Sequence, residues 1–256
     1  MVIIKSPEEI EKMRQGGKIL AEILRKVAQE VGVGISALAL DELAEKLVRD
    51  SGGTPSFKGY HGSKGDKPFP STICVSINNE VVHGSATAEK IIRSGDLVSL
   101  DIGMKYLGCF TDTAITLGVG KISREAKKLI RVTRTALESA IGKVKPGIYW
   151  QEVAETIQAY VEKNGFSVVR TLTGHGVGKF VHEDPKLPNF VGNAAFDKIM
   201  IEEGMTLAIE PMVNAGYPQV KTLPDSWTVV TTDGKLTAHF EHTIAVTKNG
   251  VEVLTI

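Results

Sequence analysis

Five side chains in this sequence have the chemistry of metal ligands, and each stands in a segment that suits the role. They are four carboxylates and one imidazole, Asp101, Asp112, His175, Glu210 and Glu241. Oxygen donors with a single imidazole make a hard, strongly anionic site, which favours two divalent ions sharing carboxylates over one tetrahedral zinc. Such a site predicts metal-assisted hydrolysis.

The two aspartates stand on either side of an expected turn. Asp101 ends the run 97–101, and Asp112 follows within 110–113. If Tyr106-Leu107-Gly108 turns the chain between two strands, both carboxylates can face one side of a hairpin. The alternative is that one aspartate caps the turn and the other pairs with a surface lysine. Apolar neighbours weigh against it, because an unpaired buried carboxylate is costly.

Both glutamates stand in strongly apolar runs that are expected to be strands. Glu210 lies in Leu207-Ala208-Ile209-Glu210-Pro211, and Glu241 lies in Phe240-Glu241-His242-Thr243-Ile244. The second half of the chain therefore repeats the arrangement of acids in the first half. The alternative is a pair of edge-strand carboxylates that face solvent.

Glycines surround the histidine in Thr173-Gly174-His175-Gly176-Val177-Gly178. They allow close approach of the backbone and leave the imidazole unobstructed. A phosphate-binding loop is the rival interpretation, but the glycine spacing is G-x-G-x-G, and Lys179 is not followed by Ser or Thr. Nucleotide binding is therefore the weaker alternative.

Two further histidines stand close in sequence to these elements. His83 follows an apolar run and precedes a glycine, and His182 comes shortly after His175. A lone histidine is more often structural than catalytic, but this proximity makes both of them candidates. Three others, His61, His239 and His242, have less support and are expected to be structural or to lie behind the ligands.

The elements that must position these residues come as pairs of helices followed by strands. Ser6, Pro7 and Glu9 form a helix start with a capping box, and the helices are expected near 6–27, 36–52, 123–141 and 148–165. Gly147-Ile148 aligns with Gly34-Ile35, and Gly165 aligns with Gly52, which indicates a weak internal repeat. Expected strands cover 72–78, 96–104 and 111–119, then 166–172, 205–213, 227–232, 238–247 and 251–256.

This order of elements predicts the fold class. Helices in pairs rule out strict alternation of strand and helix, so an antiparallel or mixed α+β fold is expected. We expect residues 1–256 to form one catalytic domain with similar halves, roughly 1–120 and 121–256.

Composition excludes several classes of protein. Thirty basic and thirty acidic residues cancel, so no overall charge favours nucleic acid or an anionic membrane. Cys74 and Cys109 belong to no disulfide framework, which suits a cytoplasmic protein. No secretory signal or membrane-spanning run is found, and the mature protein is expected to begin close to residue 1.

Together these residues resemble the dinuclear metallopeptidases of the pita-bread (creatinase/aminopeptidase) fold, specifically the type I methionine aminopeptidases. The resemblance covers essentially the whole chain. Its segments are KSPEEIEKMRQGGKIL, GYHG, INNEVVHG, LVSLDIG, TDTA, TGHGVG, the run 182–185, AIEPM and FEHTIAVT. It implies two pseudo-symmetric halves around a curved antiparallel sheet, and removal of the N-terminal methionine from peptides and nascent chains.

The resemblance also implies the roles of the ligands. Asp101 would bind one metal through both oxygens, Asp112 and Glu241 would bridge, and His175 with Glu210 would hold the other metal. The two divalent ions, Co, Mn, Fe or Zn, would lower the pKa of a bridging water, and the resulting hydroxide would attack the first peptide bond. Glu210 would carry the proton to the leaving amine.

Substrate-binding residues follow from the same resemblance. His182 would stabilise the oxyanion and His83 would orient the scissile peptide. The wall of the methionine pocket would consist of aromatic side chains and one thiol, Phe57, Tyr60, Phe69, Cys74 and Trp227. Core packing is the alternative for Phe57 and Phe69. The partner is a peptide or nascent-chain N-terminus, with transient ribosome association and no membrane or sequence-specific nucleic acid; a monomer is expected.

Three features depart from the family pattern. Residues 63–68 read as an insertion in the loop that leads to the pocket, and Leu172 and Val181 replace the larger side chains common in the family. The insertion is expected to change the rim of the pocket, and the two smaller side chains are expected to widen the pocket. A proline-specific peptidase of the same fold is the first rival, although such enzymes usually carry an extra N-terminal domain. A non-catalytic binding protein of the same fold is the second rival, although such proteins typically lose metal ligands and this chain retains all five.

Overall fold

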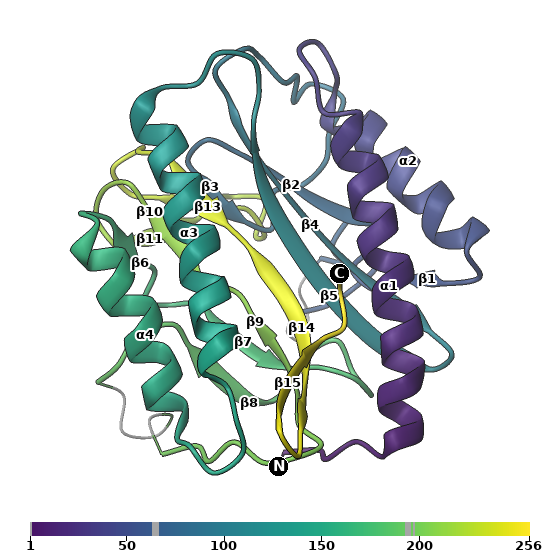
Figure 1. The fold of residues 1–256 in the computed structure, drawn as a ribbon. Helices are drawn as coiled ribbons and strands as arrows, with labels where there is room; N and C mark the ends of the chain where they lie inside the picture. The colour runs from purple at the N-terminus through teal and green to yellow at the C-terminus, as the bar shows by residue number, and fades with distance from the viewer. Residues whose placement is uncertain (1, 63–66, 193–195, 197) are drawn as a thin grey trace.

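The fold is described by a computed structural model that covers residues 2–62, 67–192, 196 and 198–256. Within these residues it has four α-helices and fifteen strands (Figure 1). The helices are α1 (Pro7–Gln29), α2 (Ala37–Asp50), α3 (Arg124–Lys143) and α4 (Trp150–Lys163). The strands of the first half are β1 (Thr54–Pro55), β2 (Ile73–Ile77), β3 (Glu80–Val82), β4 (Leu97–Tyr106) and β5 (Cys109–Gly118). Those of the second half are β6 (Ser167–Val168), β7 (Thr173–Gly176), β8 (Glu183–Pro188), β9 (Thr206–Ile209), β10 (Met212–Asn214), β11 (Val220–Thr222), β12 (Val229–Thr231), β13 (Thr237–His239), β14 (Glu241–Thr247) and β15 (Gly250–Val253).

Local sequence signals place the helix starts where they were expected. The Ser6 hydroxyl accepts a hydrogen bond from the Glu9 backbone N–H, and the Glu9 carboxylate accepts from the Ser6 N–H, which completes the capping box. The Ser36 and Ser123 hydroxyls cap α2 and α3 by accepting hydrogen bonds from the Ala39 and Ala126 N–H groups, although alanine cannot return the second bond of a capping box. Each cap satisfies a backbone donor that the helix itself leaves unpaired.

A large curved sheet joins the two halves of the molecule. Among the described strands it has nine members, in the order β1-β4-β5-β14-β9-β7-β8, with β2 paired to β4 and β15 paired to β14. Two smaller sheets have the orders β13-β10-β6 and β11-β12-β3. All of these pairings are antiparallel. The expected α+β class is confirmed. The sequence left open whether the sheet is antiparallel or mixed, and the pairings show that it is antiparallel.

The helix pairs cover the sheet in the same way in both halves. Helix α1 packs on β4 and β5, and α3 packs on β5 and β9, so the two long helices lie across one face of the sheet (Figure 1). Each half has its own hydrophobic core, one between α1, α2 and the strands β2 and β4, the other between α3, α4 and the second-half strands. No helix in the described part of the chain is both long and apolar enough to span a membrane.

The turns between paired helices show matching hydrogen bonds. The Gly34 N–H donates to the Ile92 carbonyl over 2.9 Å, and the Gly147 N–H donates to the Ile201 carbonyl over 2.9 Å. Both glycines have a positive φ, +90° and +86°. The weak repeat in the sequence therefore corresponds to two turns of the same construction, because each requires the left-handed backbone that glycine adopts at little cost.

Two runs that were expected to be single strands are each broken. Residues 205–213 form β9 and β10 with Glu210-Pro211 between them, and residues 238–247 form β13 and β14 with Phe240 between them. In both cases the chain changes sheets, from the large sheet to the small one between β9 and β10 and from the small sheet to the large one between β13 and β14, since β9 pairs with β14 whereas β10 pairs with β13. Pro211 has no N–H for a ladder hydrogen bond, which favours the break.

The expected strand at 166–172 is also shorter than predicted. Only β6 forms there.

Candidate metal centre and active site

The β4–β5 hairpin places Asp101 and Asp112 on one face. Leu107 and Gly108 form the two-residue turn with φ of 47° and 85°, the positive values that a tight hairpin of this twist requires. Asp101 lies opposite Ala114, and Asp112 lies opposite Gly103. The side chains of residues 101 and 103 share a face, so the two carboxylates are diagonal neighbours.

Strand β14 brings a third carboxylate to the same row. Glu241 lies opposite Ala114 on β5, and Ala114 in turn lies opposite Asp101 on β4. The three residues are therefore in register across adjacent strands, with the small alanine side chain between the two acids. Apolar alternation along β5 gives no hint of this row, because it depends on the pairing of strands far apart in sequence.

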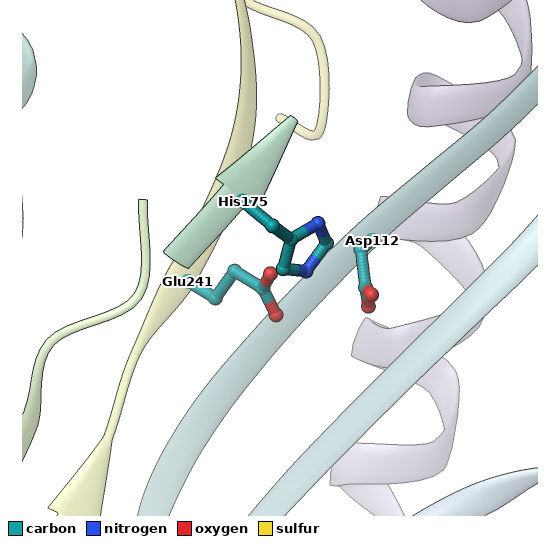
Figure 2. Close-up of side chains that lie close together, drawn as sticks. All are labelled: Asp112, His175 and Glu241. Carbon is teal, nitrogen blue, oxygen red and sulfur yellow. The ribbon is translucent and has the colours of Figure 1, made fainter. Parts of the chain in front are cut away.

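His175 completes a close group with two of the acids. It lies opposite Ala208 on β9, and Ala208 lies opposite Thr243, two residues beyond Glu241. One ligand atom from each of Asp112, His175 and Glu241 lies within 4.8 Å of the others. Figure 2 shows the three side chains pointing toward one another.

The glycines beside His175 serve close packing of strands. A Cβ on Gly174 would lie 2.4 Å from the Ala208 carbonyl oxygen, and one on Gly176 would lie 2.3 Å from that of Asp184. The His175 Nδ1–H donates to the Gly176 carbonyl over 2.8 Å. This hydrogen bond fixes the tautomer and leaves the Nε2 lone pair available for a metal.

Glu210 stands between two imidazoles at the break between β9 and β10. Its Oε1 lies 3.6 Å from Nε2 of His175, and its Oε2 lies 3.3 Å from Nε2 of His239. His239 had little support from sequence alone and was expected to be structural or to lie behind the ligands. Its burial beside a carboxylate places it behind Glu210, and no spacing rule could have shown that contact.

The pKa values of the four carboxyl groups indicate that the site would be stabilised by a cation. Burial raises the pKa of Asp112 to about 7, and burial with repulsion from neighbouring acids raises the pKa of Asp101, Glu210 and Glu241 well above the usual range. Among the described residues, Asp101 Oδ1, Asp112 Oδ1 and Glu241 Oε1 are buried without a hydrogen-bond partner. Buried carboxylates need compensation, and acceptor-only oxygens beside one imidazole suit hard divalent ions.

One cavity of about 490 Å³ gathers the predicted site residues. Its wall contains all five candidate ligands, both candidate histidines His83 and His182, and the five residues expected to line the methionine pocket. The wall also contains Gly62, Leu172 and Lys186. Lys186 lies opposite His175 in the β7–β8 pair. Lys186 could not be predicted from the sequence, because the prolines on both sides of it argue against a strand at β8.

His182 reaches the cavity beside His175. Their ring centroids are 4.5 Å apart, and His182 Nδ1 lies 2.9 Å from the Tyr60 hydroxyl. His182 is exposed at the mouth of the cavity, yet partial desolvation by the protein around it lowers its pKa to about 4. At neutral pH the ring is therefore neutral, with one nitrogen that donates and one that accepts.

His83 reaches the cavity from a strained backbone position. Its φ is +56°, which is uncommon for a residue with a side chain. Burial, with a smaller contribution from His182, lowers the pKa of His83 to about 4. Strained residues of this kind cluster at functional sites.

Aromatic rings close the apolar end of the cavity. Trp227 meets Phe69 edge to face at 5.3 Å between centroids, and it lies 6.5 Å from Tyr60. Phe57, Phe69 and Cys74 are buried in one apolar cluster at this end. Cys74 lies opposite Asp101, and burial with that negative charge raises the pKa of its thiol well above the usual value. The thiol stays protonated, which disfavours a nucleophilic role.

The departures from the family pattern lie around the same cavity. Residues 63–66 of the expected insertion lie outside the described residues; the Lys67 carbonyl beyond them accepts a 3.0 Å hydrogen bond from Trp227 Nε1. Leu172 lines the cavity itself. Val181 instead packs behind the wall with the buried cluster of Phe57 and Phe69.

Comparison with known proteins supports a peptidase. The model of metallopeptidase family M24 matches residues 11–248. A methionine aminopeptidase of Clostridium perfringens is 48% identical over 256 residues, covering 100% of this chain and 99% of that protein. The crystal structure of a methionine aminopeptidase from Thermotoga maritima has a TM-score of 0.94 and 45% identity, covering 100% of this chain and 99% of that one. An Xaa-Pro dipeptidase from Bacillus anthracis has a TM-score of 0.78 and 25% identity, covering 98% of this chain and 61% of that one.

Proposed function

This chain belongs to metallopeptidase family M24, and we propose from that membership how its residues remove an N-terminal methionine. It is a metallo-aminopeptidase of the pita-bread fold, and its cofactor is a pair of divalent metal ions. The observation that carries the residue assignment is the cavity of about 490 Å³, because a single wall contains the ligands, two histidines and an apolar end.

We assign the ions to the five converging side chains. As the family resemblance implies, Asp101 would serve one ion, His175 with Glu210 would serve the other, and Asp112 and Glu241 would serve both; all five side chains line one cavity. When bound, two such ions act as Lewis acids and make water sufficiently acidic to serve as a nucleophile near neutral pH. Co, Mn, Fe and Zn all suit this set of donors.

Glu210 is the proton carrier in this assignment. Its carboxylate oxygens lie 3.6 Å from Nε2 of His175 and 3.3 Å from Nε2 of His239, at the break between β9 and β10. A carboxylate so placed can accept a proton from the attacking water at Oε1 or Oε2. It can then deliver that proton to the amide nitrogen that leaves.

His182 and His83 act on the scissile peptide. We assign the Tyr60 O–H as donor to His182 Nδ1, which leaves Nε2–H of His182 free to donate to the carbonyl oxygen that gains negative charge. One donor of this kind is commonly worth about 10²–10³ in kcat. His83, held at its strained backbone position, orients the same peptide group.

The apolar end of the cavity selects the first side chain of the substrate. Aromatic faces and the neutral Cys74 thiol suit a flexible thioether, which makes favourable contacts with ring edges. The substrate class is therefore a peptide or nascent chain with a free N-terminal methionine.

We also propose the setting in which the enzyme works. The free cysteines Cys74 and Cys109 are both buried, which suits the reducing cytoplasm. The chain is proposed to act there as a monomer that associates transiently with ribosomes, where N-terminal methionines emerge.

The decisive experiment compares three substrates on one preparation of the enzyme with its metal content measured. Rapid hydrolysis of Met-Ala-Ser, with slow hydrolysis of Met-Pro and Ala-Pro dipeptides, is expected. Preference for the proline dipeptides would instead assign the specificity of an Xaa-Pro peptidase. Full activity after exhaustive chelation would contradict the metal mechanism itself.

A further inference from the structure

The loop between β7 and β8 joins a candidate metal ligand to a candidate catalytic residue. It spans residues 177–182, so it begins just after His175 and Gly176 and ends with His182. The start of the loop is held by backbone hydrogen bonds. Val177 N–H donates to the Thr206 carbonyl over 3.1 Å, and Phe110 N–H donates to the Gly178 carbonyl over 2.7 Å. The position of His182 then depends on what holds the far end.

Glu183 holds the far end through its own side chain. Its Oε1 accepts a hydrogen bond from the Phe180 N–H over 2.9 Å and another from the Lys179 N–H. Both donors belong to the loop that Glu183 terminates. The carboxylate therefore closes the loop on itself immediately after His182.

Lys5 supplies the charge that compensates this carboxylate. Its Nζ donates to Glu183 Oε2 and, over 3.0 Å, to the Ile3 carbonyl. The two side chains are only 2% and 1% exposed, although they lie 178 residues apart in sequence. Both carboxylate oxygens of Glu183 thus have hydrogen-bond partners.

The stem of Lys5 also fits closely against the loop. A Cβ on Gly178 would lie 2.5 Å from Lys5 Cε, so only glycine leaves room for the lysine. The Lys5 backbone N–H donates to the Gly204 carbonyl over 2.8 Å, which fixes the segment that carries it. The lysine thus reaches the loop from a fixed backbone.

Stability alone gives no reason for this pair. Burial lowers the pKa of Lys5, because solvent is removed from the ammonium group, and the attraction of Glu183 offsets only part of that effect. Well-packed apolar residues often replace a buried ion pair at no loss of stability. An apolar pair could not accept hydrogen bonds from the Lys179 and Phe180 N–H groups. It also could not link the loop to the segment that carries Lys5.

We propose that Lys5 and Glu183 are positioning residues for His182, so that the segment before α1 supports the active site. This inference rests on the role proposed for His182. The ion pair holds the loop 177–182 closed, and the Tyr60 hydroxyl holds the imidazole from the other side. Loss of the pair therefore affects the reaction through His182 and leaves the metal ligands in place.

The test uses the full, metal-loaded enzyme and the substrate Met-Ala-Ser. Lys5→Met keeps the length of the side chain and removes its charge, and Glu183→Gln keeps an acceptor for the loop. We expect kcat to fall on the order of 10–100-fold in Lys5→Met, as when residues that orient a catalytic group are removed, and to fall less in Glu183→Gln, with unchanged metal content in both. Arg14→Met is the matched control, because Arg14 pairs with Glu11 on α1 and Glu252 on β15, and neither partner lines the cavity. Its kcat and KM are expected to equal those of the parent.

A double-mutant cycle with His182→Ala separates positioning from general loosening of the fold. If Lys5 acts through His182, Lys5→Met changes kcat by less than about twofold once His182 is alanine, because coupled residues are not additive. An equal loss of kcat in both backgrounds, or an unchanged kcat in folded Lys5→Met, would overturn the positioning role.

Two further measurements keep the test decisive. Should Lys5→Met fail to fold, the pair Lys5→Met/Glu183→Gln removes both charges together, which is commonly tolerated; parental kcat in this variant would overturn the proposal. The proposed function fails separately: the parent enzyme would not cleave Met-Ala-Ser, or His182→Ala would retain parental kcat. Either result would remove the basis of the positioning role as well.

Discussion

Nε2 of His239 lies 3.3 Å from Oε2 of Glu210, and the histidine is only 1% exposed. Burial lowers the pKa of His239 to about 3, so the ring is neutral at physiological pH. A neutral imidazole has one N–H that can donate to the Glu210 carboxylate, and it adds no positive charge beside the metal ions. His239 thus resembles the outer partners that orient metal-ligating groups.

Replacement of His239 tests this orientation. We expect His239→Ala to lower kcat or metal affinity about 10–100-fold, whereas His239→Gln, which can still donate through its amide, is expected to lose less. Steady-state kinetics and metal titration of both variants provide the measurement. Equal activity of His239→Ala and the parent would show that Glu210 needs no support from this side.

Removal of a ligand or of the proton carrier should abolish turnover. We expect Glu210→Ala and His175→Ala to reduce kcat for Met-Ala-Ser by at least about 10³-fold, because groups that act as one unit fail together. Circular dichroism should show parental secondary structure, since neither side chain belongs to a hydrophobic core. Retained turnover in either variant would refute the site assignment.

The metal-free protein should lose stability as pH rises above about 7. The pKa of Asp112 is raised to about 7, and the pKa values of Asp101, Glu210 and Glu241 are raised well above their usual range. Such groups bind protons more tightly in the folded state, so their contribution is complete below about pH 4 and is lost as pH rises through the folded pKa.

Thermal unfolding of the chelated protein across this range is the measurement. The Tm of the metal-free form should fall, and that of the metal-loaded form should fall less, because metal ions replace the protons. The buried histidines oppose the acids at lower pH, because the pKa values of His83, His175, His182 and His239 are lowered to about 3 or 4 in the folded protein, and these rings gain protons on unfolding below about pH 6.5. Above about pH 7 the histidines are neutral in both states, so a Tm of the metal-free protein that increases between about pH 7 and 8.5 would contradict the burial of these acids.

Gly103 is expected to be essential for the shape of the pocket. A Cβ there would lie 2.2 Å from Ser56 Oγ and 2.9 Å from Phe57 Cε1, so Gly103→Ala should displace Phe57 from the cavity wall. Overpacking of this kind commonly costs about 1–3 kcal/mol, and KM for Met-Ala-Ser should rise.

Gly142→Ala is the matched control for this substitution. Gly142 lies in α3 with no atom near the site of its missing Cβ. It should gain about 0.5–1 kcal/mol from helix propensity with unchanged KM. Chemical denaturation and kinetics of the two variants decide between these outcomes, and a stable Gly103→Ala enzyme with parental KM would contradict the tight fit.

Much of the fold could be read from local signals. Ser6, Ser36 and Ser123 cap helices at the expected positions, and the turn at Leu107-Gly108 pairs the two aspartate strands as predicted. Each of these signals acts within about one turn of the chain, so its partners are near neighbours in the sequence. Local sequence also identified the residue types of the five candidate ligands. From those types, metal-assisted hydrolysis could be inferred.

Other features could not be predicted, since they depend on which strands pair and where they part. The prediction that Glu210 lies inside one continuous strand was wrong, because the chain changes sheets at that residue. The row formed by Asp101, Ala114 and Glu241 depends on register across three strands.

The sequence by itself therefore determined the helix boundaries, the tight hairpin, and which side chains could bind metal. Only the tertiary structure decided which groups support them: His239 behind Glu210, and Lys5 beneath the loop of His182. The physical reason is that a buried ion pair or a buried imidazole is defined by the desolvated space around it. Segments that are distant in sequence create that space when the strands pair and the sheet curves.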